Sequence, residues 1–344
     1  MHFALLGDHP DGQAAAAALA AGGHELTAYT TAADADLRRW APNAHRFADA
    51  EEILANPAVE AVIVAGRSDD LAAQLRRALQ SERHVLCYYP PGQTPDIAYE
   101  ADMLRKDVGR VLLPMLPQAL HPAVGRLAEF IRRSAKDGAA DSPIGAFRLL
   151  QMEQSGPSGA GGKPSFPGWD VLRLLAGEIV EISALAAEEH VQVGEPALVS
   201  GRFEAGGLFH AVYCAGDGPV RLAVIGDRGR AELVLPVGWQ GPAFLNWVDH
   251  AGEMREEAWD ACDLWRGVAA RFEQAVAGAA GPPTWLDAVR GLELDDAVRR
   301  SVERRRSSVL EYQEASEEIG FKGTMTLVGC GLIWAMLILL VSAY

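Results

Sequence analysis

The sequence has few cysteines, and none of them is placed to form a metal site or a disulfide framework. Its four cysteines are far apart, include no CxxC pair and have no histidine at ligand spacing: Cys87, Cys214, Cys262 and Cys330. Zinc sites and disulfide-rich scaffolds need such residues at short, regular spacings. We therefore expect reduced thiols and predict no metal site.

Basic residues are outnumbered by acidic ones. The chain has 31 Lys and Arg against 46 Asp and Glu, which gives a formal net charge of −15. A protein of this charge repels phosphate backbones, so we expect no nucleic-acid partner. Attraction to anionic lipid is excluded for the same reason, and any membrane attachment must be hydrophobic.

The N-terminus has no basic leader of the kind that begins an export signal. The first six residues, MHFALL, form a short apolar run that is typical of a buried strand. We therefore expect the body of the protein to be cytoplasmic.

Charged residues are absent from residues 323–344, GTMTLVGCGLIWAMLILLVSAY. A helix of about 22 residues rises roughly 33 Å, enough to cross a hydrocarbon layer. A buried core helix or a dimerisation helix is the alternative, but such helices seldom run this long without a polar face. The sequence thus predicts a single-pass C-terminal membrane anchor, preceded by a juxtamembrane linker at 313–322. The basic cluster at 302–306 favours a cytoplasmic body.

The first 120 residues alternate between short apolar runs and helical patterns. Strands are predicted at 2–6, 25–29, 61–65, 84–87 and 110–115, and helices at 13–21, 48–55, 70–80 and 95–106. This alternation indicates an α/β fold with a doubly wound parallel sheet, in which ligands bind at the carboxyl ends of the strands.

After residue 144 the pattern changes to alternating apolar and polar residues. Strands are predicted at 146–153, 182–193, 197–203, 208–214, 221–225 and 231–235, and helices at 259–276 and 285–305. Alternation of this kind favours a large, open, antiparallel sheet with one packed face. Residues 155–168 are too rich in Gly and Pro for regular structure.

A glycine turn, Gly7–Gly12 (GDHPDG), joins the first predicted strand to the first helix. A dinucleotide pyrophosphate sits at such a turn, on the free amides of the helix end. The middle glycine of the usual pattern is replaced by His9, and Asp8 and Asp11 add negative charge. Thr31 stands near the place of the acidic residue that usually binds the ribose. An unliganded turn is the alternative.

Five segments in order resemble the Gfo/Idh/MocA oxidoreductase family, which includes glucose-fructose oxidoreductase and inositol dehydrogenase. They are FADAEEILANPAVEAVIVA, LAAQLRRALQSERHVLCYYP, LHPAVGRLAEFI, LAVIGDRGRAELVLP and TWLDAVRGLELDDAVRRSVERRR. The resemblance covers residues 1–312. It implies a Rossmann domain at 1–120, an α/β domain with a large, open, mainly antiparallel sheet at 121–312, and pairing of two chains through that sheet. It also implies bound NAD or NADP and hydride transfer at a CH–OH carbon of a sugar or polyol. The cofactor-binding positions would be Gly7, Asp8, His9, Gly12, Thr31, Gly66, Arg67 and Pro90.

The family's catalytic motif is incomplete in this sequence. Its E-K-P lysine is replaced by Tyr89, and the position of its catalytic histidine holds Pro167. Asp170 keeps the motif's last acid, and Lys163 is the only ionisable side chain of the Gly/Pro-rich segment. Tyr89, Lys163 and Asp170 are therefore the catalytic candidates.

Two hypotheses on function follow from this pattern. One is a catalytically degenerate, membrane-tethered relative that binds a sugar-like ligand or a partner; the other is an active NAD(P)-dependent oxidoreductase with an atypical catalytic set. A membrane scaffold that dimerises through the open sheet is compatible with both.

Overall fold

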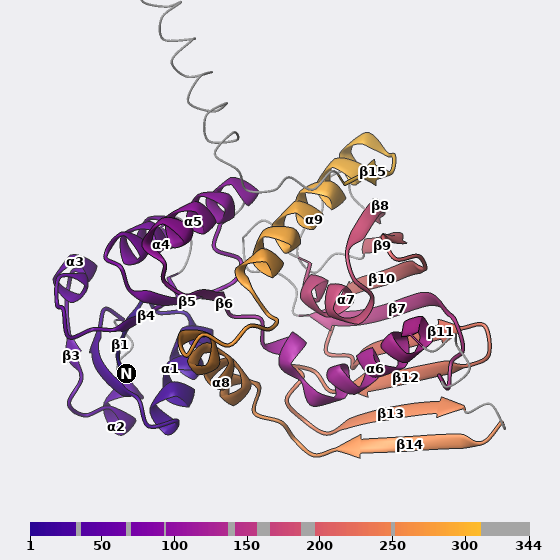
Figure 1. Ribbon diagram of the computed structural model, residues 1–344, viewed down its shortest axis with the longest axis horizontal. Coiled ribbons are helices and arrows are strands. Elements are labelled where there is room, and N and C mark those ends of the chain that lie inside the picture. The colour runs from indigo at the N-terminus through magenta and orange to yellow at the C-terminus, as the bar shows by residue number, and fades with distance from the viewer. Residues whose placement is uncertain are drawn as a thin grey trace, which may run out of the picture. The chain divides into compact units, whose positions relative to one another are not determined.

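The computed structural model describes residues 1–31, 36–66, 70–92, 94–136, 142–156, 166–186, 197–248 and 252–310. Residues 1–310 form one compact unit (Figure 1). The predicted linker and membrane anchor at 313–344 lie outside the described residues. Within the described part of the chain, no helix combines the length and apolarity needed to span a bilayer.

The first sheet is parallel and follows the order β3-β2-β1-β4-β5-β6. Its apolar central strands are almost fully buried, as expected for a sheet covered on both faces. Strand order reverses at β1, where the Rossmann fold places its ligand crevice. The predicted doubly wound parallel sheet is confirmed. Its strands are β1 (His2–Leu6), β2 (Glu25–Tyr29), β3 (His45–Arg46), β4 (Ala61–Val64), β5 (His84–Cys87) and β6 (Leu112–Pro114).

The helices of this first half agree closely with the predicted ones. They are α1 (Pro10–Ala21), α2 (Leu37–Trp40), α3 (Ala50–Leu54), α4 (Asp70–Gln80) and α5 (Pro95–Val108). There are two differences: α2 was not predicted, and α1 begins three residues before the predicted start at residue 13. Pro10 occupies its first turn, where a missing N–H costs nothing.

The second sheet follows the order β14-β13-β12-β11-β7-β10-β9-β8-β15. Its strands are β7 (Phe147–Gly156), β8 (Ile179–Ala186), β9 (Ala197–Phe203), β10 (Leu208–Ala215), β11 (Val220–Gly226), β12 (Arg230–Leu235), β13 (Ala243–Val248), β14 (Met254–Trp259) and β15 (Ser308–Val309). The sheet is mixed, because β7 and β10 pair in parallel. The predicted large, open, mainly antiparallel sheet is confirmed, because every other described pair in it is antiparallel. At the pair β7–β10 the chain returns to β7 only after two further strands.

The predicted helix at 259–276 is also wrong at its start. Trp259 ends the edge strand β14, and α8 (Leu264–Val276) begins only after Asp263, whose carboxylate caps the amides of Trp265 and Arg266. Charged residues of β14 conceal the strand pattern, because an edge strand has little core to face.

Helix α9 (Trp285–Arg304) packs against both sheets (Figure 1). Its first half, from Trp285 to Leu292, packs with β4, β5, α4 and α5 against one face of the first sheet. Its second half, from Leu294 to Val302, packs with the second sheet, with α6 (Pro122–Lys136) and with α7 (Trp169–Ala176). The short helix η1 (Pro117–Leu120) leads into α6. Helix α8 covers the opposite face of the first sheet beside α1.

Candidate functional site

The loop between β1 and α1 is wedged against the carboxyl end of β4. Gly7 has a φ of 101°, and a Cβ atom there would overlap the backbone of Ala65 and Gly66. A Cβ atom at Gly12 would overlap the Ala65 methyl group. Both positions therefore require glycine, which explains why these two glycines of the motif are present.

His9 fills the position of the motif's missing glycine. Its Nδ1 accepts a hydrogen bond from the Asp11 amide at 3.2 Å, and its own amide donates to the Ala65 carbonyl at 2.9 Å. Its ring lies on Tyr88, with centroids 3.9 Å apart and planes inclined by 35°. The end of β1 and the end of β5 are thus joined across the crevice by two rings.

Burial raises the pKa of the Asp11 carboxyl, although the nearby His9 lowers it in part. Burial also raises the pKa of the Tyr88 phenol, and the Asp11 carboxylate adds to that increase. His9, Asp11 and Tyr88 therefore form one electrostatically coupled group at the crevice, and this group has no cationic side chain of Lys or Arg.

The other predicted cofactor positions are only partly described. Thr31 is 2% exposed, and its Oγ1 has no hydrogen-bond partner among the described residues. Gly66 lies two residues after the end of β4, and Pro90 forms a cis peptide with Tyr89. Arg67 and Lys163 lie outside the described residues.

Tyr89, the residue at the family's lysine position, packs against α9. A Cβ atom at Gly291 would overlap Tyr89 Oη and lie 3.0 Å from Cζ. The phenol therefore rests on the one residue of this helix segment that has no side chain. Its ring also contacts the apolar cluster that contains Trp285 and Leu292.

Asp170, in the first turn of α7, is the most perturbed acid of the described chain. It is 8% exposed, and burial raises the pKa of its carboxyl to about 6 although the amides of Val171 and Ala119 donate to it. Its Oδ2 has no hydrogen-bond partner among the described residues. A carboxyl in this state can hold or release a proton near neutral pH.

Three further buried polar atoms without a described partner come from elements that pack beside α7. Tyr213 on β10 is 6% exposed, and burial, followed by the carboxylates of Asp295 and Asp170, raises the pKa of its phenol. His121, 1% exposed at the start of α6, leaves its Nε2 unpaired. The third atom is Gln154 Oε1, which faces Gly168 at the N-terminus of α7. We name these four side chains, Asp170, Tyr213, His121 and Gln154, the buried polar cluster.

Of this cluster, the sequence pointed only to Asp170 as a catalytic candidate. His121 makes the hydrogen bond of an ordinary helix-entry residue, because its Nδ1 accepts the Ala123 amide at 3.1 Å. Tyr213 was not singled out. The sequence does contain a signal for it: Tyr213 alternates with Phe209 and Ala211 along β10, so its hydroxyl is placed on the face of the strand that points to the core.

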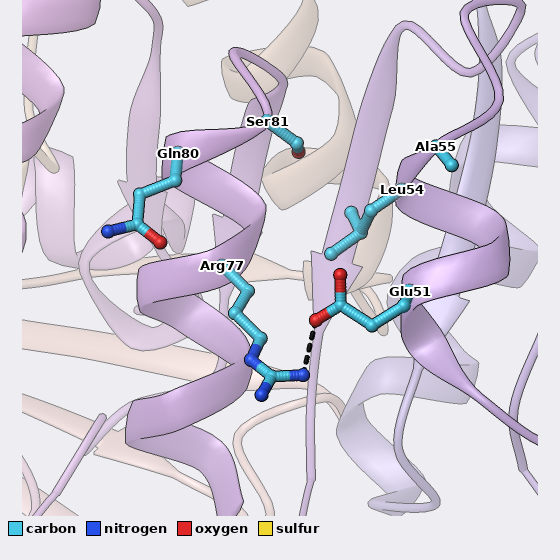
Figure 2. Close-up of a pocket in the computed structure, with 6 residues that line it drawn as sticks. All are labelled: Glu51, Leu54, Ala55, Arg77, Gln80 and Ser81. Carbon is cyan, nitrogen blue, oxygen red and sulfur yellow. Dashed lines mark hydrogen bonds and ion pairs between the residues drawn. The ribbon is translucent and has the colours of Figure 1, made fainter.

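Two surface hollows lie away from this chemistry. Figure 2 shows the first, of ≈ 410 Å³, between α3 and α4, where Glu51 and Arg77 form an ion pair. Ser81 precedes β5, so this hollow lies toward the amino ends of the strands, opposite the ligand edge. The second, of ≈ 440 Å³, lies on the face of β7–β10 that the helices leave open. Among the described residues no group of His, Cys, Asp or Glu could hold a metal ion.

No family model matches the sequence, and no curated protein matches it. Solved structures, in contrast, match nearly the whole described body. A protein of Desulfitobacterium hafniense, provisionally named an NADPH-dependent oxidoreductase, is 18% identical over 90% of this chain and 97% of its own, with a TM-score of 0.74.

Two further structures match to the same degree. One from Sinorhizobium meliloti, provisionally named a myo-inositol dehydrogenase, is 20% identical over 90% of this chain and 100% of its own, with a TM-score of 0.71. A levoglucosan dehydrogenase in complex with NADH and levoglucosan is 16% identical over 91% and 100%, with a TM-score of 0.73. The chain therefore has the fold of the Gfo/Idh/MocA-type oxidoreductases.

Proposed function

We propose that this protein is a catalytically inactive relative of these dehydrogenases, which binds a small polyhydroxylated ligand at the buried polar cluster and is held at a membrane by residues 323–344. The observation that carries the proposal is the position of Tyr89. Its phenol is packed on Gly291 of α9, so the place of the family's lysine holds a phenol that is packed against the core.

Hydride transfer from an alcohol carbon needs a base for the hydroxyl proton. Pro167, at the position of the family's histidine, has no ionisable group and is exposed. Loss of a general acid or base typically costs about 10²–10⁴ in rate. Two such losses at one site support binding without turnover.

The buried polar cluster supports ligand binding. Because Nδ1 of His121 accepts an amide and burial lowers the pKa of this imidazole, its Nε2 carries the hydrogen and donates. Tyr213 also donates, since its pKa is raised. Asp170 Oδ2 and Gln154 Oε1 accept. Hydroxyl groups both donate and accept, and a buried polar atom left unpaired costs about 1–3 kcal/mol, so the donors and acceptors of the buried polar cluster match those of a polyol.

Calorimetric titration of the full-length protein in detergent with a panel of sugars and polyols tests this proposal. We expect saturable binding of at least one polyol, weakened about tenfold by Tyr213→Phe, as for one lost buried hydrogen bond. The matched control is Tyr99→Phe, at the α5–α9 contact, which should bind normally. Failure of every polyol to bind, or NAD(P)-dependent oxidation of any of them, would refute the proposal.

The second candidate is an active NAD(P)-dependent oxidoreductase on a sugar-like CH–OH group, and the Asp170 carboxyl favours it. A pKa of about 6 suits a general base at neutral pH. In that case turnover should be measurable, should rise with pH through about 6, and should be lost in Asp170→Asn.

We also propose that the open sheet face pairs with a second copy of the chain and that the body is cytoplasmic. Apolar side chains are exposed on this face, among them Leu185, Leu208 and Phe244, at 65%, 54% and 43%. Analytical ultracentrifugation in detergent should show a dimer that Leu208→Glu dissociates. Carbonate extraction of membranes tests the anchor.

A further inference from the structure

We infer that the loop between β1 and α1 does not accept the diphosphate of a dinucleotide, although it occupies the position where the Rossmann fold binds one. The inference deepens the proposed function, because it concerns the cofactor half of the same crevice. It rests on the hydrogen bonds of the loop itself and not on the missing lysine.

The amides that a diphosphate would use are already occupied. The fold binds phosphate through free N–H groups at the start of α1. Here the His9 amide donates to Ala65 O, the Asp11 amide donates to the His9 imidazole, and the Gln13 amide donates to His9 O. Pro10 has no N–H. Within residues 9–13, all of them described, this leaves only the Gly12 amide for an anion.

The space above the loop is occupied as well. The His9 side chain lies on Tyr88 at 3.9 Å, so that the ring stands where glycine would let a phosphate approach. The Asp11 carboxylate belongs to the same group, 3.8 Å from His9 Nδ1, and would repel a diphosphate. Helix capping, ring stacking and charge therefore oppose the same ligand.

The test is direct binding to the full-length protein in detergent, by calorimetry with ADP-ribose and by fluorescence with NADH and NADPH. We expect no saturation for the wild type up to millimolar concentrations. His9→Gly combined with Pro10→Ala returns two amides to the loop and removes the ring. This variant should bind ADP-ribose at least about tenfold more tightly, as for one recovered charge-assisted hydrogen bond.

The matched control is His45→Gly with Pro95→Ala, which makes the same two changes on β3 and at the first turn of α5. It should bind no better than the wild type, and thermal unfolding should show that both variants are folded. Saturable micromolar binding of any dinucleotide by the wild type would overturn the inference. If neither the wild type nor the loop variant binds, the assignment to these two residues is overturned. The polyol titration is independent of either result, so the proposed function can fail or survive separately.

Discussion

The packing of Tyr89 against α9 can be tested by adding a single methyl group to the facing helix. Gly291→Ala places a Cβ atom on α9 that would overlap Tyr89 Oη and lie 3.0 Å from Cζ. In an open helix this substitution would stabilise by about 1 kcal/mol. Overpacking a filled core costs about 1–3 kcal/mol, and an overlap with a stiff ring belongs at the upper end. We therefore expect a net loss of about 2 kcal/mol.

The same substitution should behave differently once the phenolic oxygen is removed. In a Tyr89→Phe background the nearest atom is the ring carbon at 3.0 Å, which a shift of a few tenths of an ångström relieves. The overpacking cost should then fall to about 1 kcal/mol, nearly balanced by helix propensity. The two substitutions should thus be coupled by about 2 kcal/mol.

Equilibrium urea unfolding of the four proteins measures this coupling. The control is Gly267→Ala on α8, where a Cβ atom would lie at an ordinary 3.5 Å from Leu120 Cβ. It should stabilise by about 1 kcal/mol. If Gly291→Ala stabilises equally in both backgrounds, Tyr89 does not lie on α9. The phenol would then be free to face the crevice, and the argument against catalysis would fail.

Three other predictions concern stability, all measured by urea unfolding. The pKa of the Asp170 carboxyl is raised from 3.8 to about 6 in the folded protein, so the folded state holds a proton that the unfolded state loses, and the free energy of unfolding falls as the pH rises from about 4 to 6. Asp170→Asn should abolish this fall, which is at most about 3 kcal/mol. If the variant keeps the wild-type pH profile, the carboxyl is not buried. Asp287→Ala removes the capping box of α9 and one partner of the buried Arg173 of α7, so it should lower the free energy of unfolding by about 3 kcal/mol. The control Asp296→Ala loses only surface ion pairs on the same helix and should lower it by less than about 1 kcal/mol. Equal losses in the two variants would refute this distinction. Gly23→Ala, at a φ of 90° with open space around it, should lower the free energy of unfolding by about 1–2 kcal/mol. Gly7→Ala adds an overlap with backbone atoms and should lower it by more than about 3 kcal/mol. Similar losses would show that the loop between β1 and α1 is not packed tightly against β4.

The first half of the fold is predictable from sequence because its strands are continuous apolar runs between amphipathic helices. β1, β2, β5 and α4 begin and end where the pattern places them. The second sheet is less predictable, since the pairing of β7 with β10 depends on strands far apart in the chain. β14, rich in Arg and Glu, shows no alternation that would distinguish it from a helix start.

The candidate site was predictable in only some of its positions and in none of its contacts. Sequence placed Gly7, His9 and Asp170 correctly in the turn and on α7. It could not show that the His9 imidazole caps α1, nor that Tyr89 faces a glycine two hundred residues later. Both depend on pairings between elements, which a local pattern does not encode.

The bridging position of α9 has a consequence for how the chain acquires its structure. The hydrophobic face of β4 and β5 is completed by Trp285, Ala288, Val289 and Leu292, which are translated long after those strands. Until these residues leave the ribosome, the first sheet exposes an apolar surface that no N-terminal segment covers. Contacts of such long sequence separation slow folding and prolong the exposure of aggregation-prone surface. A nascent chain truncated before residue 285 should therefore depend on chaperones even though all six strands of its first sheet are present.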